Sequence, residues 1–394
     1  MNKKSPKIRF KGFTDDWEQR KLGELASFSK GAGYTKGDLK TTGGKPIILY
    51  GRLYTKYETV IENVDTFVDE KEKSVISAGN EIIVPASGET SEDISRASVV
   101  AKPGIILGGD LNIVKPNTEI DASFLALTIS NGRQQKELSK KAQGKSVVHL
   151  HNSDLKEVTL VYPKKEEQTR IGNFFKNLDN TIALHQRKLT LLEQLKQSYL
   201  QLMCPQNKGN IPALRFAGFS EPWEQRKIRE LFTVTRGQVL AATKTKDKET
   251  NNFIYPVYSS QTKNNGLMGF YDQYLFENAI TWTTDGANAG TVNFRKGKFY
   301  STNVNGVLLS DKGFANKAIS EIINKIAWKH VSKVGNPKLM NNVMSEITVT
   351  IPFVEEQNKL SLLFEQLDDT IDLHKCMLDK LLELKLVFLR KMFL

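Results

Sequence analysis

The sequence predicts an α/β fold in which two globular modules of mixed α+β structure are each followed by a long α-helix. A first duplication supports this class: residues 9–21 recur with few changes at 215–227. A second duplication lies further along each copy, where motifs within 163–182 return at 352–371. Unlike sequence separates the two repeated segments. A repeated frame around unlike inserts predicts two divergent modules on one pseudo-two-fold symmetric scaffold.

The repeats divide the chain of 394 residues into four parts. We expect a first module over 1–162, a helical segment over 163–204, a second module over 205–352 and a second helical segment over 353–394. A chain of this length exceeds a single hydrophobic core, so more than one domain is expected.

Each module has the texture of short strands with a few helices. Apolar, β-branched runs lie between glycine and asparagine residues, as strands and turns require, at 46–50, 81–85, 253–258, 279–283 and 306–309. Longer periodic segments predict one helix in each module, at 122–138 and 317–331.

The composition points to a basic protein of the cytoplasm. The formal charge is +12 and the isoelectric point about 9.3. This excess of cations favours a polyanionic partner such as nucleic acid. Two cysteines provide neither a disulfide framework nor the ligands of a structural zinc site. The basic start of the chain lacks the apolar core of a signal peptide, and no apolar run is long enough for a membrane span. We therefore expect a cytoplasmic location.

Each helical segment carries a clear start signal. Pro163 and Pro352 stand where a missing N–H group costs nothing, and a pair of glutamates follows each proline near the positive end of the helix dipole. The predicted helices run from about 166 to 203 and from about 355 to near the end of the chain.

Both helices carry an apolar seam with alternating steps of three and four residues, which is the pattern of a coiled coil. The simplest partner for each seam is the other copy. We expect an antiparallel pair and keep a parallel pair as the alternative. His185 and His374 are interpreted as polar seam residues that set the register, rather than as a metal site. Lys196 and Lys385 are expected to extend along the seam edge. The predicted pairing residues are Leu178, Ile182, His185, Leu189, Leu192, Leu367, Ile371, His374, Leu378 and Leu381.

Motifs for catalysis are missing from the sequence. It contains no Gly-x-x-x-x-Gly-Lys-Ser/Thr phosphate loop, no adjacent prolines of the amino-methyltransferase type and no strand–Gly-x-Gly–helix unit. The five histidines have no metal-ligand spacing. We predict no catalytic residues, no metal site and no cofactor in this chain.

The modules instead combine basic residues with aromatic and amide side chains around glycine-rich turns. These residue types grip phosphates or read base edges. Any single one is more often an ordinary surface residue, so the prediction rests on the set. The candidates for DNA binding are Lys30, Tyr34, Lys36, Arg52, Tyr54, Lys56, Ser87, Thr90, Arg96, Lys145, Arg236, Lys244, Lys246, Tyr258, Ser260, Gln261, Lys263, Thr284, Asn288, Asn336 and Lys338.

The repeated segments resemble those of a known family. A Gly-Phe-x-x-x-Trp-Glu-Gln-Arg-Lys segment, a variable module, a Pro-x-x-Glu-Glu-Gln motif and a Leu-Asp-x-Thr-Ile motif each occur twice in this order. This order is similar to that of the specificity (S) subunit of type I restriction–modification enzymes, over essentially the whole chain.

The resemblance implies a non-catalytic DNA reader. Two target-recognition domains would each read half of a split site, and an antiparallel coiled coil would set the spacing. Two methyltransferase subunits would dock and bring S-adenosylmethionine, and restriction subunits would add ATP- and Mg-dependent steps. Recognition domains vary too much for base contacts to be carried over. The alternatives are a coiled-coil adaptor that binds no nucleic acid and a stand-alone DNA-modifying enzyme.

Overall fold

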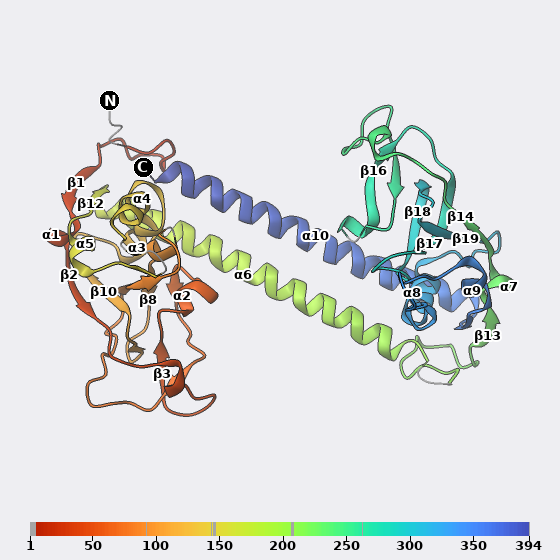
Figure 1. The fold of residues 1–394 in the computed structure, drawn as a ribbon, viewed down its shortest axis with the longest axis horizontal. Helices are drawn as coiled ribbons and strands as arrows, with labels where there is room; N and C mark the ends of the chain where they lie inside the picture. The colour runs from red at the N-terminus through yellow and green to blue at the C-terminus, as the bar shows by residue number, and fades with distance from the viewer. Residues whose placement is uncertain are drawn as a thin grey trace. The chain divides into compact units, whose positions relative to one another are not determined.

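The computed structural model describes residues 5–91, 93–142, 144, 147–205, 209–261 and 263–393 (Figure 1). The chain forms two compact units, Met1–Gln186 with Cys376–Leu394, and Arg187–Lys375. Each unit contains one module and a part of both long helices, α6 (Lys165–Leu202) and α10 (Val354–Met392). Both ends of α6 and the start of α10 lie within one residue of the bounds predicted from the sequence.

The first unit is built on a five-stranded sheet in the order β2-β10-β6-β8-β4, in which only β4 and β8 are parallel neighbours. A three-stranded sheet β5-β3-β9 and the pairs β1-β12 and β7-β11 complete it. The strands are β1 Glu18–Lys21, β2 Ala26–Lys30, β3 Lys45–Ile48, β4 Val60–Ile61, β5 Phe67–Val68, β6 Glu81–Pro85, β7 Ser87–Gly88, β8 Ser98–Val100, β9 Ile106–Leu107, β10 Leu111–Pro116, β11 Val148–His149 and β12 Thr159–Tyr162.

The helices of this module are short. They are α1 Leu22–Leu25, α2 Arg52–Thr55, α3 Ala122–Ser130, α4 Gly132–Lys141 and α5 Asn152–Lys156, with 3₁₀ turns η1 Lys36–Asp38 and η2 Asp93–Ser95. The sequence predicts one helix over 122–138, but the structure divides it between α3 and α4. The helical path is broken because Asn131 is extended and Gly132 has a φ of +70°, which glycine tolerates and other residues rarely adopt.

The second unit is built on a six-stranded sheet in the order β14-β19-β17-β18-β15-β16, with the pair β13-β20 beside it. Its strands are β13 Glu224–Lys227, β14 Thr233–Arg236, β15 Tyr255–Tyr258, β16 Leu267–Tyr271, β17 Phe276–Thr283, β18 Val292–Ser301, β19 Asn305–Leu309 and β20 Thr348–Ile351. Its helices are α7 Ile228–Leu231, α8 Lys317–Ala327 and α9 Asn341–Glu346, with 3₁₀ turns η3 Ala242–Lys244, η4 Lys263–Gly266 and η5 Trp328–His330.

The core of each unit joins the module to a long helix. In the first unit Phe124 of α3 is fully buried with Phe175 of α6. In the second unit Ile319 of α8 is buried in one cluster with Trp282 of β17 and Phe364 of α10. Burial of large aromatic side chains stabilises this attachment by roughly 2–3 kcal/mol each.

The repeated sequence segments form the same clamp in both units. Arg9 makes a two-pronged contact with Glu167, with Nε–Oε1 at 2.9 Å and Nη2–Oε2 at 2.7 Å. Arg215 and Glu356 make the same contact at 3.0 and 2.7 Å. Paired hydrogen bonds between guanidinium and carboxylate are strong and directional. The first repeat thus supplies the arginine of each clamp and the second repeat supplies the glutamate.

Within each unit α6 and α10 run antiparallel. In the first unit Phe174 lies 5.0 Å from Phe388 between ring centroids, and Asp179 lies 2.5 Å from Lys385. In the second unit Glu193 pairs with Lys375 at 3.2 Å and Lys196 with Asp368 at 2.7 Å. Residue numbers rise along one helix as they fall along the other, so the antiparallel prediction holds in each unit.

The seam residues are withdrawn from solvent. Leu178, Leu189, Ile371, His374 and Leu378 are buried. The other five are half-buried. The two seam lysines, Lys196 and Lys385, differ from the prediction. Their side chains are only 17% and 20% exposed and form ion pairs with aspartates of the opposite helix, because a carboxylate lies within reach of each amine.

Among the described residues, no helix combines the length and the apolar character that crossing a membrane requires.

Candidate nucleic-acid interface

The first module presents a polar loop directly after its central strand β6. Ser87 and Gly88 pair with Val148 and His149, which precede α5. The hydroxyl of Tyr54 donates to the Ser87 carbonyl at 2.8 Å. Burial raises the pKa of the Tyr54 hydroxyl, which therefore stays protonated and able to donate. Helix α2 thus supports this loop from one side.

The loop continues to a charged turn. Thr90 donates its hydroxyl to Asp93 at 2.8 Å, and Arg96 contacts the same carboxylate at 2.5 Å. The Arg96 guanidinium also lies 6.0 Å from the centre of the Tyr54 ring. Ser87, Thr90 and Arg96, predicted from the sequence as one polar loop, therefore share a local surface with Tyr54.

Other candidates of the first module are occupied in its own structure. Arg52, whose side chain is 9% exposed, pairs with Glu58 and Asp65 at 2.7 Å each. Lys56 contacts the same Asp65 at 2.8 Å. Hydrogen bonding to Lys56 is the main cause that lowers the pKa of Asp65 to about 2. Because carboxylates already neutralise Arg52 and Lys56, both residues act first in holding the 52–65 segment together.

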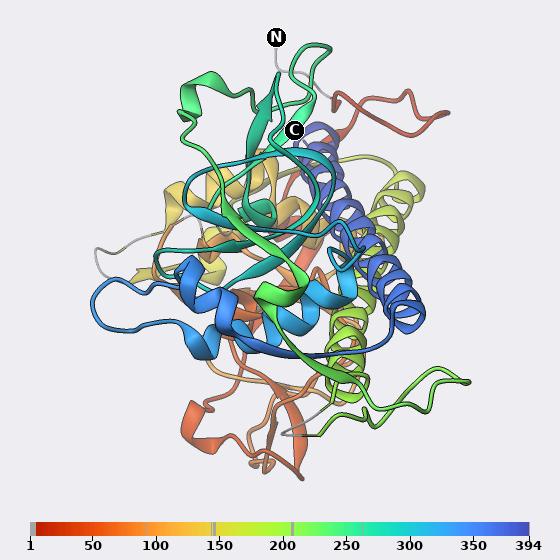
Figure 2. The ribbon, with the colours of Figure 1, turned by 90° about the vertical axis from the view of Figure 1, so that its right-hand side faces the viewer.

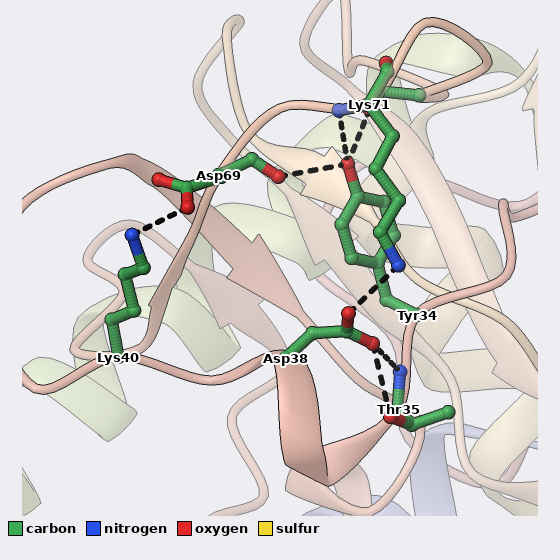
Figure 3. A network of polar contacts seen from close by, with 7 residues as sticks. Tyr34, Thr35, Asp38, Lys40, Asp69 and Lys71 are labelled. Atoms are coloured by element: carbon green, nitrogen blue, oxygen red, sulfur yellow. Dashed lines mark hydrogen bonds and ion pairs between the residues drawn. The ribbon is translucent and has the colours of Figure 1, made fainter.

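Tyr34 is the centre of a second internal network (Figure 3). Its ring is buried, its hydroxyl accepts from the Lys71 N–H at 2.8 Å and lies 2.5 Å from the Ser74 hydroxyl. The Lys71 amine lies 4.5 Å from the ring centroid and 2.8 Å from Asp38. This hydrogen bond is the main cause that lowers the pKa of Asp38 to about 2. We therefore leave Tyr34 out of the proposed DNA surface, whereas Lys30 and Lys36 nearby are exposed.

In the second module three polar loops meet. The loop after β17 lies beside the 332–338 loop, because the Gly286 N–H donates to the Pro337 carbonyl at 3.0 Å and Leu339 N–H to the Thr284 carbonyl at 2.8 Å. Asn288 donates its amide to the Ser260 carbonyl at 3.3 Å. The structure thus brings together candidates that lie far apart in the sequence: Tyr258, Ser260, Thr284, Asn288, Asn336 and Lys338.

Arg295 packs against Tyr258 at the base of these loops. No sequence motif had singled this residue out. The residue is 6% exposed, its guanidinium lies 3.7 Å from the centre of the Tyr258 ring, and its Nε donates to the Thr281 hydroxyl at 3.1 Å. Burial lowers the pKa of Arg295 to about 10, so the side chain remains charged at neutral pH. A buried cation stacked on an aromatic ring fixes that ring in place.

Comparison with known proteins identifies the architecture. A family model described as the type I restriction modification DNA specificity domain matches residues 14–194 and again residues 220–383. The chain belongs to this family. The family consists of DNA specificity subunits rather than enzymes, which agrees with the role predicted from the sequence.

Relatives support this assignment, and a solved structure shares the fold. A Mycoplasma pneumoniae protein whose name places it among type I specificity subunits is 30% identical over 218 residues, which are 55% of this chain and 77% of that protein. The specificity subunit of the type I restriction enzyme MpnII from the same bacterium is 32% identical over 158 residues, 39% of this chain and 46% of that one. A crystal structure of a type I restriction–modification S subunit from M. genitalium shares the fold, with a TM-score of 0.71, 16% identity and 99% coverage of both chains.

Three further basic candidates of this specificity subunit lie on the surface of the second module. Arg236, Lys244 and Lys246 are exposed, and the Lys246 amine lies 5.8 Å from the centre of the Phe253 ring. Gln261 is exposed and donates to the Leu267 carbonyl. Lys145 lies outside the described residues, and only the backbone of Lys263 is described.

Two histidines at the first loop cluster were also missed. His149 and His151 are exposed with parallel rings 6.4 Å apart, while Val148 before them and Leu150 between them are buried. This alternation is visible in the sequence as a two-residue period and could have placed both histidines on the surface.

Among the residues that the structure describes, no group of three or more His, Cys, Asp or Glu side chains is arranged to hold a metal ion.

Proposed function

We propose that this specificity subunit reads a split DNA site, one half with each module. In this proposal α6 and α10 hold the two modules at a set spacing and bind two methyltransferase subunits, through which restriction subunits join the complex. S-adenosylmethionine, ATP and Mg belong to those partners. Because the substrate is DNA, we place the protein in the cytoplasm.

The observation that supports the proposal most is the equivalent position of the two loop clusters. In the first module the cluster follows β6 and pairs with the segment before α5. In the second it follows β17 and pairs with the segment before α9, through the bridge between Asp285 and Lys338. Side chains that follow a rigid strand are well positioned for recognition. The two clusters differ in their side chains, so we expect the half-sites to differ.

Exposed leucines on the long helices support the docking of two partners. On α6, Leu184 and Leu195 are 66% and 40% exposed, and on α10 the equivalent Leu373 and Leu384 are 59% and 43% exposed. Apolar side chains gathered on a surface are typical of protein interfaces. The first unit holds Leu184 and Leu384 and the second holds Leu195 and Leu373, so each unit offers a similar pair of exposed leucines to one methyltransferase subunit.

The proposal is tested by producing the chain together with type I methyltransferase subunits and mapping methylated sites across a genome. We expect one bipartite motif. Exchanging residues 22–162 for those of a relative should change only one half of it. Binding should weaken with salt, with a slope of log K against log salt of roughly −0.9 for each phosphate neutralised. A single contiguous motif, or changes in both halves after the exchange, would contradict independent reading by two modules. If DNA binding neither weakened with salt nor depended on the DNA sequence, the coiled-coil adaptor would be the favoured alternative.

A further inference from the structure

The 332–338 loop of the second module is closed and firmly anchored. Ser332 and Lys338 exchange two backbone hydrogen bonds of 2.8 and 3.1 Å, so the residues between them form a short tip. Gly335 at this tip has a φ of +71°, which favours glycine. In Figure 2 the blue segment between α8 and α9 projects from the body of the second unit. The loop is therefore a shaped projection.

Its base joins the core of the module. The carbonyl of Leu339, just after the loop, accepts from the indole N–H of the buried Trp282 at 2.9 Å. The Lys338 amine lies 3.7 Å from the Asp285 carboxylate. Together with the backbone bonds from Gly286 and Leu339 described above, these contacts fix the loop on the proposed DNA-reading cluster. A loop held in this way can enter a groove without first losing conformational freedom.

The tip combines an apolar side chain with polar neighbours. Val334 is 91% exposed, the largest value among the exposed large hydrophobic side chains of the described residues. Lys333 and Asn336 on either side are also exposed. Single apolar residues on a surface are common and need no explanation by themselves. Here the valine stands at the end of an anchored loop, beside basic and amide groups, on the surface proposed to face DNA.

Base-pair chemistry indicates which group this tip fits. The thymine methyl group is the apolar feature of base edges, and it lies in the major groove, which is about 12 Å wide and admits a two-stranded ribbon. We propose that the 332–338 loop enters the major groove of the second half-site, an inference that rests on the proposed function. Val334 then contacts a thymine methyl group, and Lys333 contacts a neighbouring phosphate. Val334 is in this way a specificity-determining residue.

Replacement of thymine by uracil tests this contact, because it removes only the methyl group. The complex with methyltransferase subunits is titrated with duplexes in which each thymine of the methylated motif is replaced in turn. At one thymine of the half-site read by the second module, we expect uracil to weaken binding by the wild-type complex about fourfold, the value of one buried methyl group. With Val334→Ser the same replacement should have no effect at that position. Val343→Ser, at a valine of α9 that is 39% exposed, serves as the matched control and should behave as wild type.

The outcomes separate this inference from the proposed function. Specific binding with no uracil-sensitive position, or with equal sensitivity in wild type and Val334→Ser, would overturn the Val334 contact while leaving bipartite reading intact. The absence of specific binding by the wild-type complex would overturn both. A half-site without thymine would also contradict the assignment. Lys333→Ala should weaken binding to every sequence by a similar factor and lower the salt slope by about one.

Discussion

Asp179 of α6 and Lys385 of α10 form an ion pair of 2.5 Å, and Asp368 and Lys196 form the equivalent pair of 2.7 Å in the second unit. Each aspartate belongs to a copy of the Leu-Asp-x-Thr-Ile motif, and each lysine lies on the apolar seam of the opposite helix. A charge in a seam is tolerated only where its partner meets it. The two pairs therefore select one antiparallel register of the helices in each unit.

Exchanging the charges of the first pair tests this role. Asp179→Lys or Lys385→Asp alone should destabilise the protein by about 1–3 kcal/mol, because each leaves two like charges in a partly buried site. The double exchange should recover most of the loss in thermal unfolding. The exposed pair of Glu166 and Arg170 is the control, and Glu166→Ala should cost less than about 1 kcal/mol. Additive losses in the double variant would mean that the pair does not set the register.

The second unit extends its pair into a ring of four charges, which should respond non-additively to substitution. Lys196 and Lys317 each contact both Glu321 and Asp368, at distances from 2.6 to 2.9 Å. Lys317→Ala leaves two carboxylates around one lysine and should be more destabilising than the double variant Lys317→Ala with Glu321→Ala, which leaves one balanced pair. We expect the difference to be on the order of 1 kcal/mol in urea unfolding.

The first unit has alanine at both positions that correspond to those changed in the double variant. Asp121 and Asn316 both cap a helix by accepting an N–H three residues on. Counted from these caps, Ala122 and Ala126 of α3 occupy the places of Lys317 and Glu321. A double variant less stable than Lys317→Ala would show that the ring contributes more than charge balance.

The ring should also make the second unit sensitive to acid. Burial raises the pKa of Asp368, but Lys317 and Lys196 outweigh this effect and hold the pKa below its usual value. A carboxyl group with a lowered pKa in the folded state stabilises the protein above its unfolded pKa of about 4, and this stability is lost as pH falls through the folded pKa. Asp368→Asn should therefore flatten the dependence of unfolding free energy on pH below about 4. Equal pH dependence in variant and wild type would rule out this contribution.

The seam can be tested with a matched pair of leucines on α6. Leu189 is 6% exposed and Leu184 is 66% exposed. Leu189→Asp should cost about 3 kcal/mol or more, because it places an unpaired charge in the seam. Leu184→Asp should leave thermal stability almost unchanged and instead weaken binding to the methyltransferase subunit, as measured by calorimetry. Similar stability of the two variants would contradict the assignment of seam and docking surface.

Arg295 should affect one half-site through the loops that it supports. Arg295→Lys removes the planar stack on Tyr258 and should destabilise the protein by about 1–2 kcal/mol. In methylation mapping we expect relaxed sequence preference in the half-site of the second module and no change in the other half. Relaxation of both halves would indicate general loss of folding rather than positioning of a loop. Arg229→Lys, at an exposed arginine outside the predicted DNA-binding set, provides the control.

The sequence by itself determined the frame of this protein. The two duplications, the helix start signals and the apolar seam are local or periodic patterns. They predicted the long helices, the mixed modules and the family, because helix geometry and repeats depend on neighbours along the chain. The same patterns located the segments around β6 and β17, where the polar loops begin.

Only the tertiary structure decided which side chains are available for recognition. Tyr34 and Arg52 have the residue types of DNA contacts. Yet Ser74 and Lys71 contact the first, and Glu58 and Asp65 neutralise the second. The 284–288 and 332–338 loops meet, and Arg295 stacks on Tyr258, through contacts between residues far apart in the sequence. The physical reason is that a charged or hydroxyl group binds whichever partner the fold brings within about 3 Å. Local sequence patterns do not predict which residue that partner will be.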